Sequence, residues 1–174
     1  MVHFARAAGA LLAAFLAAAP AAQAQQGGAP LESRLAARKV VVVEGRDAFA
    51  DANAARPGDV IEYLATYRNT GSSPITGLEA TVPIPGNTEF VPGSARPAGA
   101  RASLDGRNYA DIPLKRTVTR GGKQVEEQVP YREYRSLRWT AGELGGGKTL
   151  VFTARVRVVD DRAPGEPGSK GGGR

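Results

Sequence analysis

The stretch PGDVIEYLATYRNTG, residues 57–71, decides the fold that this sequence predicts. It opens with a turn, because Pro fixes φ and Gly tolerates a positive φ. Between positions 61 and 67, every second residue is apolar or aromatic, and the residues between them are polar except Leu64. This alternation is typical of a strand with one buried face. The closing Asn-Thr-Gly favours a turn, so the stretch predicts one turn-bounded strand.

Further segments of the chain repeat this unit of turn, strand and turn. The run of four valines at 40–43 favours a strand by its β-branching, and its lack of alternation predicts burial on both faces or a crossing between sheets. Residues 45–55 form a predicted Ala/Asp-rich loop. Further strands are predicted at 75–84, 88–91, 100–104, 108–112, 134–141 and 150–158. Short strands at this spacing, without a convincing helix, predict an all-β fold, an immunoglobulin-like antiparallel β-sandwich of Greek-key type.

The clearest predicted hairpin surrounds Gly121 and Gly122, which suit a two-residue turn with positive φ. Pairing outward from this turn places apolar residues opposite each other and, with one exception, opposite charges together. The predicted pairs are Arg120 with Lys123, Val118 with Val125, Arg116 with Glu127, and Leu114 with Val129.

Both ends of the chain differ in composition from the strands between them. Residues 1–24 resemble a secretory signal peptide, with Arg6, an Ala/Leu/Phe segment and an Ala-Gln-Ala cleavage site. The apolar run is too short to predict a transmembrane span. We expect a flexible leader at 25–37, one domain at 38–159 and a disordered Gly/Pro/charged tail at 160–174. The predicted location is the periplasm, the cell surface or the medium.

Composition restricts the chemistry of the mature chain. The 174 residues contain no Cys and one His, His3, inside the predicted signal peptide. The predicted mature chain therefore has no thiol and no imidazole. This excludes a Ser-His-Asp triad, a Cys nucleophile, a disulfide, a His-ligated haem and a Cys/His zinc site. The formal net charge is +6. In an exported protein, such a charge favours solubility or contact with anionic envelope polymers over nucleic acid.

Several motifs together resemble the domain-of-unknown-function 11 (DUF11) family of exported bacterial and archaeal proteins, over about residues 38–159. They are Pro57-Gly58-Asp59 with Tyr63, Asn69-Thr70-Gly71, Pro83-Ile84-Pro85-Gly86, Thr88 to Ser94, Leu137 to Thr140, Leu144 to Gly147, and the strand to Val158. The resemblance implies an immunoglobulin-like sandwich in cell-surface proteins and brings no catalytic residues. This chain has one copy, and Val82 precedes Pro83 where many members carry Asp before Leu-Pro.

Two functions fit these features, and both are non-catalytic. The first is a structural or protein-interaction module of the bacterial envelope. The second is a binder of anionic glycan or lipid through a basic and aromatic face within residues 115–138, since guanidinium forks and aromatic rings suit phosphate and sugar. The candidate residues are Arg116, Arg120, Lys123, Arg132, Tyr134 and Arg135. The same pattern also arises if Trp139 is a core residue and the arginines are solvated.

Catalytic, metal and cofactor sites are not predicted. Glu126 and Glu127 are adjacent in a strand and point to opposite faces, so they cannot act together on a glycosidic bond. The acids at 47, 51 and 59 lack the spacing of a calcium loop. The Gly-rich segment 145–149 lacks the first Gly of a phosphate loop and leads into a strand.

Overall fold

The computed structural model describes residues 30–160, which form eleven strands and two short 3-10 turns. In chain order the elements are β1 (Leu31–Val43), β2 (Arg46–Asp51), η1 (Ala52–Ala54), β3 (Val60–Asn69), β4 (Ile75–Pro83), β5 (Thr88–Phe90), β6 (Arg101–Ser103), β7 (Ala110–Asp111), β8 (Lys115–Arg120), β9 (Lys123–Gln128), η2 (Tyr131–Glu133), β10 (Ser136–Leu144) and β11 (Thr149–Val158). The predicted signal peptide and most of the predicted tail lie outside these residues.

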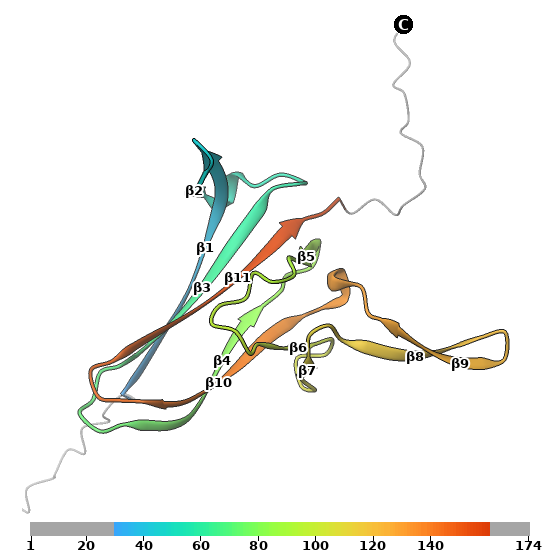
Figure 1. Cartoon of the computed structure of the whole chain (residues 1–174). Helices are drawn as coiled ribbons and strands as arrows, with labels where there is room; N and C mark the ends of the chain where they lie inside the picture. The colour runs from blue at the N-terminus through green and yellow to red at the C-terminus, as the bar shows by residue number, and fades with distance from the viewer. Residues whose placement is uncertain (1–29, 161–174) are drawn as a thin grey trace, which may run out of the picture.

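Two antiparallel sheets pack as a sandwich (Figure 1), which confirms the all-β prediction. One sheet has the order β2-β1-β3-β11-β5, and the other has the order β4-β10-β6-β7. A separate two-stranded sheet, β8-β9, extends away from both. The turn-bounded strand predicted within residues 57–71 is β3, the central strand of the larger sheet.

The core lies between the inner faces of the two sheets and follows the predicted alternation. Phe152, Ala154 and Val156 of β11 are buried, as are Ala80 and Val82 of β4. A further strand, β10, contributes the single tryptophan, Trp139, whose Nε1 donates to the carbonyl of Pro97 at 2.7 Å. Its ring lies 5.4 Å from that of Phe152. Tyr67 of β3 meets Phe152 edge-on, with the ring centroids 6.0 Å apart.

The N-terminal part of the described chain differs from prediction in three respects. Residues 31–37 were expected in a flexible leader, but they belong to β1 and pair residue by residue with β3. The predicted loop at 45–55 contains β2, which forms a hairpin with the second half of β1. The valine run is not buried on both faces, since Val42 is 71% and Val43 56% exposed. The cause is topological: β1 and β2 occupy one end of the larger sheet (Figure 1).

Two hairpins lie in the middle of the chain, and one of them is the hairpin predicted around Gly121 and Gly122. The register of β8 and β9 is as predicted, and the backbone N–H of Val129 donates to the carbonyl of Leu114 at 2.9 Å just beyond them. β6 and β7 pair around the Asp105-Gly106 segment, with Ala102 opposite Ala110. Their loop is longer than the two-residue turn that Asp-Gly favours, because Asp105 accepts hydrogen bonds from the next residues of the loop.

The turn at the end of β3 is locked to the Gly-rich turn before β11. The buried Asn69 side chain donates to the carbonyls of Ser73 and Leu144, at 2.8 and 2.9 Å. Gly146 lies against the backbone of Ser72 so closely that a Cβ there would be 2.3 Å from the Ser72 carbonyl oxygen. Asn69 and Gly146 therefore join the two turns at one end of the sandwich.

Candidate functional site

The β8–β9 hairpin carries half of the residues predicted to form a ligand face. The register places Arg116, Val118 and Arg120 opposite Glu127, Val125 and Lys123, so these six side chains share one face of the two-stranded sheet. We call these six residues the contact face of the hairpin. The opposite face carries only polar side chains, namely Lys115, Thr117, Thr119, Gln124, Glu126 and Gln128.

Carboxylates neutralise much of the positive charge on the contact face. Arg116 donates to Glu127 at 2.9 Å and to Glu133 of η2 at 2.7 Å, and Arg120 donates to Glu127 at 2.6 Å. Hydrogen bonding from Arg116 lowers the pKa of Glu127, and the bond to Glu127 raises the pKa of Arg116, so the pair stays ionised around neutral pH. The face is therefore less basic than its arginines alone suggest.

Tyr134 was predicted in the ligand face, and that prediction is wrong. Its side chain is fully buried, and its hydroxyl accepts a hydrogen bond from the backbone N–H of Leu114 at 2.7 Å. Its ring stacks on Phe90 at 6.1 Å and meets Tyr131 edge-on at 5.4 Å. Tyr134 follows η2, where the backbone leaves the two-residue period of a strand, so alternation could not place it.

The other predicted residues lie apart from the paired arginines. Lys123 is exposed beside the hairpin turn, Arg132 is exposed in η2, and Arg135 is exposed before β10. The guanidinium of Arg135 donates to the carbonyls of Arg132 and Tyr134. The structure thus brings together Arg116, Arg120 and Lys123, while Arg132 and Arg135 belong to the segment below the hairpin.

The hairpin has a fixed base and an exposed apolar centre. At the base, Leu114 and Val129 are buried in the core and hydrogen bonded to each other. Farther out, Val118 and Val125 lie opposite each other, and Val125 is 44% exposed. An isolated two-stranded hairpin is marginally stable in water, so this one depends on its base. The arrangement presents an apolar pair flanked by ion pairs at a fixed position.

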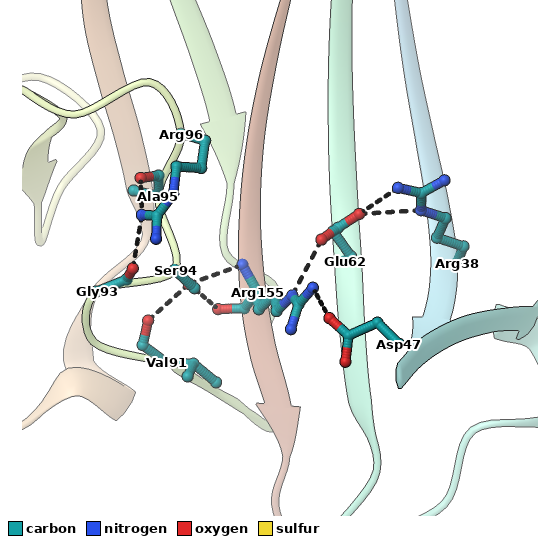
Figure 2. A network of polar contacts seen from close by, with 9 residues as sticks. All are labelled: Arg38, Asp47, Glu62, Val91, Gly93, Ser94, Ala95, Arg96 and Arg155. Carbon is teal, nitrogen blue, oxygen red and sulfur yellow. Dashed lines mark hydrogen bonds and ion pairs between the residues drawn. The ribbon is translucent and has the colours of Figure 1, made fainter. Parts of the chain in front are cut away.

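A second polar cluster, which sequence reasoning missed, crosses the outer face of the larger sheet (Figure 2). The register aligns Arg38 of β1 and Arg155 of β11 with Glu62 of β3. Arg38 donates to Oε1 of Glu62 through Nε at 2.9 Å and Nη2 at 2.6 Å, and Arg155 donates to Oε2 at 3.0 Å. Arg155 also donates to Asp47 of β2. We call these four residues the ion ladder.

The ion ladder is a structural cross-link. Glu62 is only 6% exposed, and both of its oxygens are occupied by guanidinium groups. Hydrogen bonds to Asp47 and Glu62 raise the pKa of Arg155, so this guanidinium stays charged and keeps both bonds. Arg38 additionally covers the ring of Phe49, with Cζ 3.3 Å from the ring centroid. The cluster therefore ties β2, β1, β3 and β11 together across the sheet.

A polar groove of about 450 Å³ borders the ion ladder, between β11 and the segment after β5. Ser94 shapes this edge, since its hydroxyl donates to the carbonyl of Val91 at 2.6 Å and accepts from the N–H of Arg155 at 3.0 Å. Arg96 donates to the carbonyls of Gly93 and Ala95. The polar groups on both sides of the groove are thus engaged within the chain.

The three acids considered for a metal loop are separately engaged. Asp47 bonds to Arg155, Asp51 caps η1 through the N–H of Asn53, and Asp59 pairs with Lys39 at 2.7 Å. Within residues 30–160, no group of three or more His, Cys, Asp or Glu side chains lies in an arrangement able to hold a metal ion. No helix in that part of the chain has the length and apolar character to cross a membrane.

Comparison of the chain with family models, curated proteins and solved structures gives no match in any of the three.

Proposed function

We propose that this chain is a non-catalytic, exported protein-interaction module of the bacterial envelope, in which the β8–β9 hairpin is the arm that contacts a protein partner. The observation that carries the proposal is the position of the hairpin, which extends from the sandwich (Figure 1) while its base is fixed in the core. The DUF11 resemblance and the immunoglobulin-like Greek-key topology that it implies are part of this proposal, as is export through the signal peptide.

The composition of the contact face favours a protein partner over a polyanion. Its centre is the apolar pair of Val118 and Val125, and its two arginines already bind carboxylates. Protein interfaces combine a desolvated apolar centre with a polar rim. A polyanion would have to compete with Glu127 and Glu133 for Arg116. The alternative function, binding of anionic glycan or lipid, would use these two arginines and Lys123 on the hairpin, with Arg132 and Arg135 below it.

Site-specific photo-crosslinking in the producing cells tests the proposal. A photoreactive amino acid replaces Lys123 at the tip of the hairpin or, as a matched control, Lys148 in the turn before β11; both lysines are exposed. We expect a protein adduct of defined mass from position 123 and none of that mass from position 148. Failure to trap any protein from position 123, or equal adducts from both positions, would overturn the contact-arm proposal.

Replacing Arg116, Arg120 and Lys123 together by Ser separates the two functions. If the arm binds a polyanion, binding of the purified protein to anionic polysaccharide or anionic vesicles falls with added salt, because exposed charges are screened over about 8–10 Å at physiological ionic strength, and the triple variant does not bind. We expect no salt-sensitive binding by the wild-type protein. Strong salt-sensitive binding that the triple variant loses would establish the alternative instead.

A further inference from the structure

Most sheet edges in residues 30–160 are protected against pairing with another chain. Strands β2, β5 and β7 are six, three and two residues long. The edge strand β4 contains Gly77 at φ 68° and ends at Pro83. The N–H of Thr81, which does not pair with β10, donates to the hydroxyl of Tyr67 at 3.1 Å. Short strands, irregular backbone and proline are the usual means of protecting an edge.

Apart from the two edges of the separate β8–β9 hairpin, the first half of β1 is the exception. β2 covers β1 only along Arg38–Val43, whereas β3 pairs with β1 from Leu31 to Val40. Within residues 30–160, residues 31–37 therefore have a neighbouring strand on one side only. Residues 32–37 are all exposed, and the segment contains no proline, no glycine and no register shift. It is the longest regular open edge in the part of the chain that the structure describes.

The backbone direction along this edge follows from its first hydrogen bond. The carbonyl of Pro30 accepts from the N–H of Thr70 at 2.6 Å, so residue 30 faces β3. Consecutive residues in a strand direct their N–H and C=O groups to opposite sides. Leu31, Ser33 and Leu35 therefore direct both groups toward the open edge.

We propose that two copies of this chain pair antiparallel along this edge, about a two-fold axis at Ser33. In this register Ser33 faces the partner's Ser33, and Leu31 faces the partner's Leu35. These are the residues whose backbone groups point outward, so each pair can exchange two hydrogen bonds as an antiparallel ladder requires. The inference does not depend on the contact arm, which lies on a different part of the chain.

Side-chain charge selects this register. Glu32 and Arg34 lie on the outer face of the sheet, and pairing about Ser33 sets each Glu32 against the partner's Arg34. Moving the axis by one residue sets Glu32 against Glu32 or Arg34 against Arg34, and like charges directly opposite are destabilising. On the inner face the same register sets Leu31 against Leu35, the latter 48% exposed in the single chain. Charge and apolar complementarity therefore coincide.

The symmetry of this contact gives a closed dimer, because the same patch is used on both copies. Few residues take part, so we expect a weak dimer whose population depends on concentration. Pairing with a strand of a different protein would instead leave the purified chain monomeric, and that outcome would overturn the proposal.

An introduced cysteine tests the axis directly, because the chain has no Cys of its own. In Ser33→Cys, the two Cα atoms should lie about 5.5 Å apart, within the range that a disulfide spans. Ala37→Cys, on the same face of the same strand, is the matched control, since its two copies would lie about 27 Å apart at roughly 3.4 Å per residue. On mild oxidation we expect a covalent dimer for Ser33→Cys and at least tenfold less for Ala37→Cys. Equal yields, or none for Ser33→Cys, would overturn the register.

Reciprocal charge reversal then tests the pairing in solution by sedimentation of the purified protein. We expect Glu32→Arg and Arg34→Glu each to raise the dimer dissociation constant about tenfold or more, and the double variant to restore it to within about threefold of wild type. Glu143→Arg, at another exposed strand position, is the matched control and should leave it unchanged. A wild-type protein that stays monomeric at high concentration, or a double variant no better than either single one, would overturn the proposal.

Discussion

Replacing Tyr134 by Phe should destabilise the protein and loosen the base of the β8–β9 hairpin. The substitution keeps the buried ring and its contacts with Phe90 and Tyr131 but removes the hydroxyl to which the Leu114 N–H donates at 2.7 Å. Leu114 is itself buried, so its N–H would lose its partner where water cannot replace it. An unsatisfied buried donor costs about 1–3 kcal/mol, and we expect the free energy of unfolding to fall by that amount.

Urea denaturation followed by the fluorescence of Trp139 measures the global effect, and hydrogen exchange at the Leu114 amide measures the local one. Tyr131→Phe is the matched control, because Tyr131 is only half-buried and its hydroxyl has no hydrogen bond within residues 30–160. It should change the free energy of unfolding by less than about 0.5 kcal/mol. If Tyr134→Phe is equally mild and the Leu114 amide exchanges no faster, the bond does not hold the hairpin base.

The same variant has a pH signature. Burial raises the pKa of Tyr134, so folding favours the neutral phenol. The stability that this residue contributes is complete below about pH 10 and is lost as pH rises through the higher pKa of the folded state. The alkaline loss of stability should therefore be smaller in Tyr134→Phe than in wild type, and an identical alkaline limb would contradict this assignment.

Three further predictions follow from the fold. Trp139→Ala should lower the free energy of unfolding by about 3–5 kcal/mol, because it empties a core site between the sheets, and native wild-type emission at the wavelength of a solvated indole would contradict the burial. Gly146→Ala should lower the free energy of unfolding by about 1–3 kcal/mol, because its Cβ would overlap the Ser72 backbone. Gly145→Ala is the control and should be tolerated, since its Cβ would meet only Lys148 Cγ, at 3.5 Å. Equal melting temperatures of the two variants would refute the close approach at Gly146. The hydrogen bond from Lys39 lowers the pKa of Asp59. The stability that ionised Asp59 contributes is therefore present above about pH 3.8 and is lost as pH falls through the lower pKa of the folded state. Asp59→Asn should flatten the acid limb of the curve of stability against pH.

Strand positions and local pairing could be predicted because each depends on neighbouring residues. Alternation located β3 and β11, and the Gly121-Gly122 turn set the register of β8 with β9. The exposed state of β1 could not be predicted in this way. Leu35 lies on the same face of the sheet as its buried partner Ala65 of β3. It is nevertheless exposed, because the second sheet does not cover β1 at this place. Burial there depends on the relative extents of the sheets, which no local pattern encodes.

The candidate site illustrates the same limit. The cross-strand pair of Arg116 and Glu127 followed from the hairpin turn, but the contact between Arg116 and Glu133 needed the position of η2. The ion ladder joins Arg38, Glu62 and Arg155, which are 24 and 93 residues apart, through the strand order β1-β3-β11. From the sequence alone, a charged residue on the outer face of a strand is expected to be solvated. Only the strand order shows that Arg38 and Arg155 enclose Glu62 from the two neighbouring strands.

Shortening the hairpin tests the central proposal most directly. Replacing residues 117–126 by Asn-Gly keeps the two pairs nearest the base, with Arg116 and Glu127 next to a two-residue turn, and leaves Leu114, Val129 and Tyr134 in place. The measurement is the amount of protein partner recovered with the tagged chain after crosslinking in the producing cells, alongside the melting temperature of the purified variant. We predict that recovery falls at least tenfold while the melting temperature stays within a few degrees of wild type. Undiminished recovery from a folded, shortened chain would contradict the account.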